Sequence, residues 1–131
     1  MTAHTDTIAA VFARVESLAG FTLVWPRKGA DQPAGEHVRV ALVPNDNLPA
    51  DLSSDVMRRR GFVVLTLVSP IGEYQVESEA KAATIAAHFP RALRLTRNST
   101  VVQIGGATVR QAREESGRWE TPVWVDYRAI A

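Results

Sequence analysis

The chain contains no cysteine, and this absence excludes several classes of site. Disulfide scaffolds, thiolate nucleophiles and cysteine-based zinc sites all need that residue. Long apolar runs are also missing: the longest, residues 61–68, is interrupted by Thr66, whereas a membrane-spanning helix needs ~20 apolar residues. Residues 1–6 lack the basic segment that begins a signal peptide. We therefore expect neither a membrane span nor export.

The chain also lacks an excess of charge of either sign, because 15 Lys and Arg residues nearly balance 14 Asp and Glu residues, which gives a formal net charge of +1. A net charge so close to zero gives no overall attraction to nucleic acid, so such a contact would need a local basic patch. Apolar residues make up 46% of the chain, which is ordinary for a folded globular protein. A length of 131 residues fits one domain, and we expect residues 1–131 to form it around one hydrophobic core.

The most informative stretch is residues 61–90, around which the rest of the chain is expected to be organised. Its first part has mostly apolar residues on both faces of a strand: Val63, Leu65 and Leu67 on one, and Phe62, Val64, Thr66 and Val68 on the other. Two apolar faces are typical of a central strand that is covered on both faces of the sheet. The second part, residues 73–89, has Ala82, Ile85 and Phe89 at helical spacing, which predicts a helix folded back over the sheet.

The remaining segments have helical, strand or turn compositions. Apolar residues at helical spacing predict a first helix over residues 7–19. Residues 27–35 and 45–55 have loop compositions, and Gly105 and Gly106 indicate a turn. The predicted fold is α+β, a single mixed, mainly antiparallel sheet of about five or six strands with two helices on one face. Strand-like composition occurs at residues 21–25, 37–43, 62–68, 94–97, 101–104, 108–114 and 118–130.

Helices on one face leave the other face of such a sheet uncovered. That face is expected to include Phe62 and Val64 of the central strand and Trp124 of the last strand. Either the long loops of the same chain or a second copy of the protein must then cover it. We therefore name Phe62, Val64 and Trp124 as candidate residues for packing between subunits.

No group of residues has the spacing of a catalytic, cofactor or metal site. His4, His37 and His88 match no histidine metal motif, which favours ordinary surface or interface roles. The serines include none in a nucleophile elbow, and Gly105 and Gly106 lack the pattern of a phosphate-binding loop. We predict no enzymatic activity, no cofactor and no metal. A hydrolase or isomerase would need acidic or histidine side chains that converge only in the folded chain.

The most prominent charged feature is the run Arg58, Arg59 and Arg60, immediately before the central strand. Arginine binds phosphate and carboxylate oxygens through paired hydrogen bonds, so these residues are candidate contacts to DNA or to an acidic protein surface. Arg27 and Lys28, in the first long loop, are candidates of the same kind. The alternative is a solvated strand end whose charges prevent edge-to-edge aggregation.

The order of these elements resembles the tail terminator, or tail-completion, proteins of long-tailed bacteriophages and gene transfer agents. The similarity extends over nearly the whole chain. It is carried by the helix ending Leu18-Ala-Gly20, the step Val24-Trp25-Pro26, the strand at residues 37–43, the central Gly61-Phe-Val-Val-Leu-Thr-Leu-Val with Pro70-Ile-Gly72, the helix ending Ile85-Ala-Ala-His-Phe89, and the closing Gly117-Arg-Trp-Glu-Thr-Pro-Val-Trp-Val-Asp-Tyr127.

The resemblance implies a structural virion protein without enzymatic activity. It implies a homohexameric ring that sits on the end of the tail tube protein, stops tube growth and joins the tail to the head-connector (stopper) protein. DNA would pass through the channel of this ring without sequence-specific contacts. The same resemblance implies assembly in the bacterial cytoplasm, a final location at the head–tail interface of a virion or gene-transfer-agent particle, and no membrane partner.

A hypothesis from a different class stays open at this point. The chain would then be a small nucleic-acid-binding or adaptor module that acts through Arg58, Arg59 and Arg60. This hypothesis predicts duplex DNA binding with a steep salt dependence, weakened when the arginines are replaced. The terminator hypothesis predicts instead that rings form once the tail-tube partner is present.

Overall fold

The computed structural model describes residues 3–25, 35–49, 57–70, 75–98, 100–115 and 117–130. The mixed α+β class predicted from the sequence is confirmed, with helices where apolar residues recur at helical spacing and strands where they alternate. The elements follow in the order α1 (Ala3–Glu16), β1 (Leu23–Val24), β2 (His37–Pro49), β3 (Met57–Pro70), α2 (Gln75–Ala87), β4 (Arg94–Arg97), β5 (Thr100–Val109), β6 (Arg113–Glu115) and β7 (Arg118–Ile130).

The strands of the described residues form one sheet of seven strands. Their order is β1-β2-β3-β7-β5-β4, and β6 pairs with the beginning of β7. β1 runs parallel to β2, and the other pairs are antiparallel. The predicted count of five or six strands is too low. All seven segments with strand-like composition contain paired residues. The expected polar strand at residues 108–114 is shared between β5 and β6: β5 ends at Val109, the Arg110 amide still donates to the Pro122 carbonyl oxygen, and pairing resumes at Arg113.

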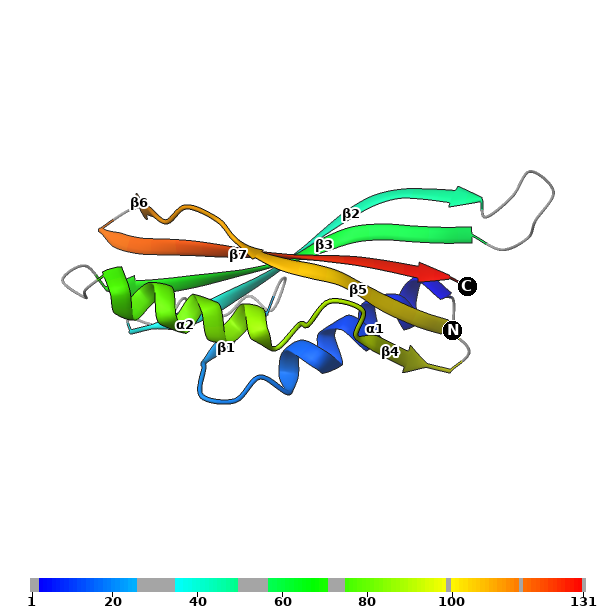
Figure 1. Ribbon diagram of the computed structural model, residues 1–131, viewed down its shortest axis with the longest axis horizontal. Helices are drawn as coiled ribbons and strands as arrows, with labels where there is room; N and C mark the ends of the chain where they lie inside the picture. Colours follow the sequence, from blue (N-terminus) through cyan, green and yellow to red (C-terminus); the bar gives the residue numbers. More distant parts are fainter. Residues whose placement is uncertain are drawn as a thin grey trace.

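Both helices cover the same face of this sheet. Figure 1 shows the sheet nearly edge-on, with α1 and α2 on its lower side and no described helix above it. At one end β2 and β3 extend past the other strands, and β6 lies at the opposite end (Figure 1). Neither described helix has the length and hydropathy to cross a bilayer. The predicted placement of two helices on one face is therefore confirmed.

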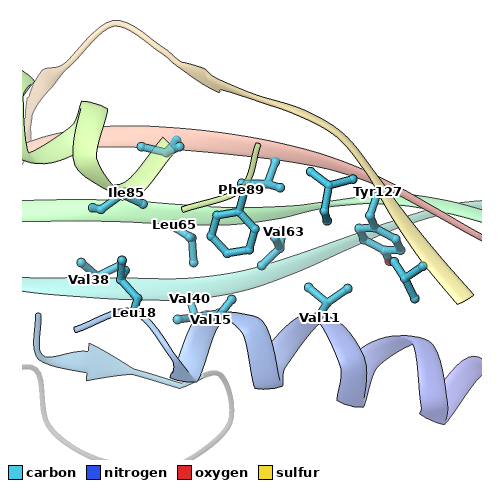
Figure 2. Close-up of a cluster of buried hydrophobic side chains, with 14 of the residues drawn as sticks. Val11, Val15, Leu18, Val38, Val40, Val63, Leu65, Ile85, Phe89 and Tyr127 are labelled. Atoms are coloured by element: carbon cyan, nitrogen blue, oxygen red, sulfur yellow. The ribbon is translucent and has the colours of Figure 1, made fainter. Parts of the chain in front are cut away.

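The hydrophobic core lies between the helices and the sheet. Figure 2 shows Val11 and Val15 of α1 pointing toward the strands, with Ile85 and Phe89 approaching from the α2 side. Phe89 is among the largest fully buried side chains, with 1% of its surface exposed. Alternate residues of the four central strands complete this core, as the period of two in a strand requires: Val38, Val40, Val63, Leu65, Leu67, Val102, Ile104, Val123, Val125, Tyr127 and Ala129.

β3 is the central strand predicted from the sequence, because it pairs with β2 on one side and with β7 on the other. Gly61 stands at the beginning of its apolar part and packs tightly against both neighbours. A Cβ atom at this position would lie 2.5 Å from Tyr127 Oη and 2.8 Å from the Val43 carbonyl oxygen. Steric contact, rather than an unusual backbone angle, therefore calls for glycine here.

Three expectations about local structure are wrong. The loop expected at residues 45–55 is in part a strand, because β2 continues to Pro49. β1 pairs with only two residues of β2, so the far part of β2 has no described outer neighbour, and proline is tolerated at such an edge. The arginines expected before the central strand lie inside β3, which begins at Met57. Gly105 and Gly106 do not end a strand but lie within β5, at a register shift between Ile104 and Gly106.

The C-terminal ends of the two helices are tied together by polar contacts. α1 ends at Glu16 and α2 at Ala87, each earlier than predicted. The Arg14 guanidinium donates from Nε and Nη2 to the His88 carbonyl oxygen at 2.9 and 2.8 Å. His88 Nε2 lies 3.0 Å from the Arg14 carbonyl oxygen and 2.8 Å from Ser17 Oγ. These contacts satisfy carbonyl groups of the kind that helix ends leave unpaired.

Candidate functional site

The face of the sheet opposite the helices, called the open face below, has an unusual composition for a surface. On β3 it contains Phe62, Val64 and Thr66, which alternate with the core residues Val63 and Leu65. No described helix covers this face (Figure 1). Around Phe62, Val64 and Trp124 it carries large apolar side chains, where a solvated sheet face normally carries polar ones. The open face is therefore the strongest candidate for a binding surface.

Two aromatic rings meet at the middle of the open face. Trp124 of β7 is the cross-strand partner of Val64. Its ring packs edge-on against Phe62, with centroids 5.2 Å apart and planes at 68°. The Arg110 guanidinium carbon lies 4.2 Å from the centroid of the Trp124 ring, a cation–π contact. The structure thus brings together the three predicted packing residues Phe62, Val64 and Trp124, which we call the aromatic platform.

Exposed apolar surface continues from the platform onto β2. Val43 is the cross-strand partner of Phe62, and 40% of its surface is exposed. Ala41, the partner of Val64, is also exposed. Apolar side chains therefore form a continuous strip across β2, β3 and β7. Val43 and Ala41 are the exposed members of this strip, whereas Phe62 and Trp124 are half-buried and Val64 is 9% exposed. Apolar surface on a sheet face that no described helix covers is typical of interaction sites.

The open face is hollowed beside the platform. This hollow has a volume of about 460 Å³ and contains an ion pair across β3, in which Arg39 Nη2 of β2 lies 2.9 Å from Glu120 Oε1 of β7. Arginine and tryptophan are enriched where proteins bind proteins. The composition of the hollow therefore favours a protein partner. Its lining comprises Arg39, Val64, Thr66, Arg110, Gln111, Arg113, Glu120, Pro122 and Trp124.

The five predicted basic contacts are not all placed by the structure. Arg60 has an exposed side chain and alternates with Gly61, which puts it on the open face with Phe62. Arg58 and Arg59 lie in β3 opposite Ile130 and Ala129. Arg27 and Lys28 lie outside the described residues.

Arg60 is aligned with two further arginines that the sequence analysis did not single out. It pairs with Arg128 of β7, Arg128 pairs with Gln103 of β5, and Gln103 pairs with Arg94 of β4. Arg60, Arg128 and Arg94 are all exposed. Adjacent strands lie about 4.8 Å apart, so this line spans about 14 Å across four strands. We call Arg60, Arg128 and Arg94 the arginine row.

A second hollow, of about 380 Å³, borders the arginine row. Gly105 makes room there for the Asp126 carboxylate, since a Cβ atom at Gly105 would lie 2.7 Å from Asp126 Oδ2. The extra residue in β5 at this point therefore shapes the hollow. Its lining is mostly polar and comprises Arg91, Ala92, Gln103, Ile104, Gly105, Asp126 and Arg128.

The described residues include no group of three or more His, Cys, Asp or Glu side chains close enough to hold a metal ion. His37 is buried in β2, with Nδ1 3.0 Å from the Gly35 carbonyl oxygen. His88 takes part in the helix–helix contacts described above. Apolar side chains, arginines and a tryptophan are prominent on the open face, a composition typical of protein interfaces.

A family model described as "Phage tail terminator protein" matches residues 6–127. The chain belongs to the phage tail terminator family. The resemblance noted in the sequence is thereby confirmed. This terminator is a structural protein of a virion tail.

Two solved structures share the fold of this terminator. One is 22% identical, with a TM-score of 0.76, and the match covers 95% of this chain and 94% of the other. The second comes from the virion of a native gene transfer agent particle and is 15% identical, with a TM-score of 0.61 and coverage of 99% and 98%. A comparison with curated protein sequences finds no match.

Proposed function

We propose that this terminator, acting as one domain over residues 1–131, forms a homohexameric ring. The ring caps the tail tube, stops its growth and joins the tail to the head connector, while DNA passes through the channel. One observation carries the proposal: the open face presents a continuous apolar and aromatic strip with no described helix over it. Covering such a strip with a second copy removes apolar surface from water, which favours association.

The aromatic platform has the composition of an interface centre. Tryptophan is among the residues that most often dominate binding energy, especially where polar groups around it exclude water. Trp124 is flanked here by Arg110 at 4.2 Å and lines the same hollow as the Arg39–Glu120 pair. We therefore expect Trp124 to contribute more to ring formation than any other residue of the open face.

Assembly of the full chain with its tail-tube partner tests this proposal, with mass photometry and negative-stain imaging as readouts. The unmodified chain should give rings. Trp124→Ala should raise the concentration needed for half-assembly at least about tenfold, because removal of an interface tryptophan costs about 2 kcal/mol or more. Trp124→Phe should recover part of this loss.

Val76→Ala is the matched control. Val76 is 79% exposed, but it lies on α2, on the helix side of the sheet. Its truncation should leave assembly unchanged, and thermal unfolding of each isolated variant checks that the fold is intact. A chain that stays monomeric even with its tail-tube partner contradicts the proposal.

A further inference from the structure

The arginine row places like charges directly opposite one another. Arg60 and Arg128 are cross-strand partners, and both are exposed. Like charges in facing positions of a sheet destabilise it. The ion pairs found among the described residues, Arg39–Glu120 and Lys81–Glu36, leave all three row arginines without a carboxylate partner. Guanidinium groups arranged in this way are suited to oxygen anions supplied from outside the subunit.

The surroundings of the row favour a protein carboxylate over DNA phosphate. Phe62 follows Arg60 on the same face of β3, and its partner Val43 is 40% exposed. Asp126 lies on the same face of β7 as Arg128, so the row is not part of a continuous positive surface of the kind that binds DNA. DNA-binding surfaces are strongly positive and polar, whereas arginine mixed with aromatic and apolar side chains is typical of protein interfaces.

Two acidic residues lie at the other end of β7; as consecutive residues of a strand they point to opposite faces, and Arg118 lies opposite Glu115. Glu114 and Glu115 of β6 are both exposed, and they pair with Trp119 and Arg118 at the beginning of β7. No ion pair found within the described ranges involves either carboxylate. We call Glu114 and Glu115 the acidic tip.

The acidic tip does not reach the arginine row of its own subunit. Along β7 nine residue steps separate Trp119, beside the tip, from Arg128 in the row. At about 3.3 Å per residue this separation is about 30 Å. Figure 1 shows β6 and the C-terminal end of β7 at opposite ends of the molecule. A contact between tip and row therefore joins two copies.

We infer that the acidic tip of one copy binds the arginine row of the next copy in the ring. The inference rests on the proposed ring and names the charged contact that orients its subunits. Each copy gives its tip to one neighbour and receives the tip of the other, so the contact is head-to-tail. Contacts of this kind close into rings when the rotation between copies is right.

Charge reversal on each side provides the test. One variant carries Arg60→Glu with Arg128→Glu, and the other carries Glu114→Arg with Glu115→Arg. With the tail-tube partner present, each alone should need at least about tenfold more protein for half-assembly, because like charges then face each other across the contact. Equal mixing of the two variants should restore ring formation, since every basic tip then meets an acidic row and every acidic tip a basic row.

Two substitutions control for a general effect of charge. Arg97→Glu changes an exposed arginine at the end of β4. Arg97 lies on the same side of the strand as Leu95, which packs against the core, and therefore on the opposite side from Arg94. Glu77→Arg changes an exposed carboxylate of α2. Both variants should reach half-assembly at a protein concentration within about twofold of that of the unmodified chain, because their side chains lie away from the open face.

The outcomes separate this inference from the proposed function. Rings of the unmodified chain, together with unchanged assembly of both reversed variants, overturn the inference and leave the ring standing. Failure of the mixture to recover also overturns it. Normal assembly of the Arg60→Glu/Arg128→Glu variant, with loss of duplex DNA binding at low salt, assigns the row to phosphate and overturns it as well. An unmodified chain that never forms rings with its tube partner overturns both.

Discussion

The substitution Gly61→Ala adds a single methyl group at the centre of the sheet, where there is no room for it. The new Cβ would lie 2.5 Å from Tyr127 Oη, 2.8 Å from Tyr127 Cζ and 2.8 Å from the Val43 carbonyl oxygen. Favourable carbon contacts lie near 3.5–4.0 Å, so each distance is about 1 Å too short. The Val43 oxygen belongs to the backbone of β2, whose pairing with β3 holds it in place.

Two opposing effects set the change in the free energy of unfolding that Gly61→Ala causes. Alanine restricts the unfolded chain more than glycine does, which alone would stabilise the protein by about 0.4–1 kcal/mol. Overpacking of a filled interior costs about 1–3 kcal/mol, and contact with backbone places Gly61→Ala near the upper end. The net loss in the free energy of unfolding is therefore about 2 kcal/mol. For a chain of this size such a loss lowers the melting temperature by about 6–10 °C.

Thermal unfolding of the isolated chain, followed by circular dichroism at low concentration, measures this loss without a contribution from assembly. Gly35→Ala is the control, because nothing lies within 4 Å of a Cβ atom there. Adding Tyr127→Phe to Gly61→Ala should recover only part of the stability, since the contacts with Cζ and with the Val43 oxygen remain. A Gly61→Ala protein that melts within about 2 °C of Gly35→Ala would refute the packing argument.

Three further outcomes are expected. Arg14→Met should lower the free energy of unfolding by about 1–2 kcal/mol in urea, because the His88 carbonyl oxygen loses two charged donors, whereas Arg97→Met should have little effect. Burial raises the pKa of Tyr127 above its ordinary value of 10.0, so the folded chain keeps a proton that the unfolded chain releases. Stability should therefore fall as the pH rises above 10.0, and Tyr127→Phe should flatten this decline in a pH series of melts. Phe89→Ala should cost about 3–5 kcal/mol in urea, against almost nothing for Val76→Ala, because Phe89 is 1% exposed and Val76 is 79% exposed.

Patterns within a single strand or helix were predictable from the sequence. The two apolar faces of residues 62–68 correctly indicated a central strand, and the spacing of Ile85 and Phe89 correctly indicated a helix packed on the sheet. The uncovered face followed from the same reasoning, because helices on one side leave the opposite face of the sheet without a helix over it. Phe62, Val64 and Trp124 could be named before any coordinates because alternation alone assigns their faces.

Contacts between distant strands could not be predicted in this way. Periodicity says which face a residue occupies but not which strand lies beside it, so alternation puts Arg128 on the face of Trp124 but gives no link to Arg60. Strand β7 lies between β3 and β5, and this order is what creates the arginine row. The turn assigned to Gly105 and Gly106 was wrong for a related reason. Pairing with β7 carries β5 through both glycines, and the space needed by Asp126 explains Gly105.

The position of β7 also couples the core to the open face. Its residues Val125 and Tyr127 enter the core, while Trp124 and Arg128 occupy the opposite face. Because side chains alternate with a period of two, a slip of one residue between β7 and β3 would exchange these sets, burying Arg128 and exposing Val125. The cost of burying an unpaired charge is large, so that slip is strongly disfavoured. The pairing that builds the core therefore also holds the aromatic platform and the arginine row in register, and a binding surface on this face needs no separate element to position it.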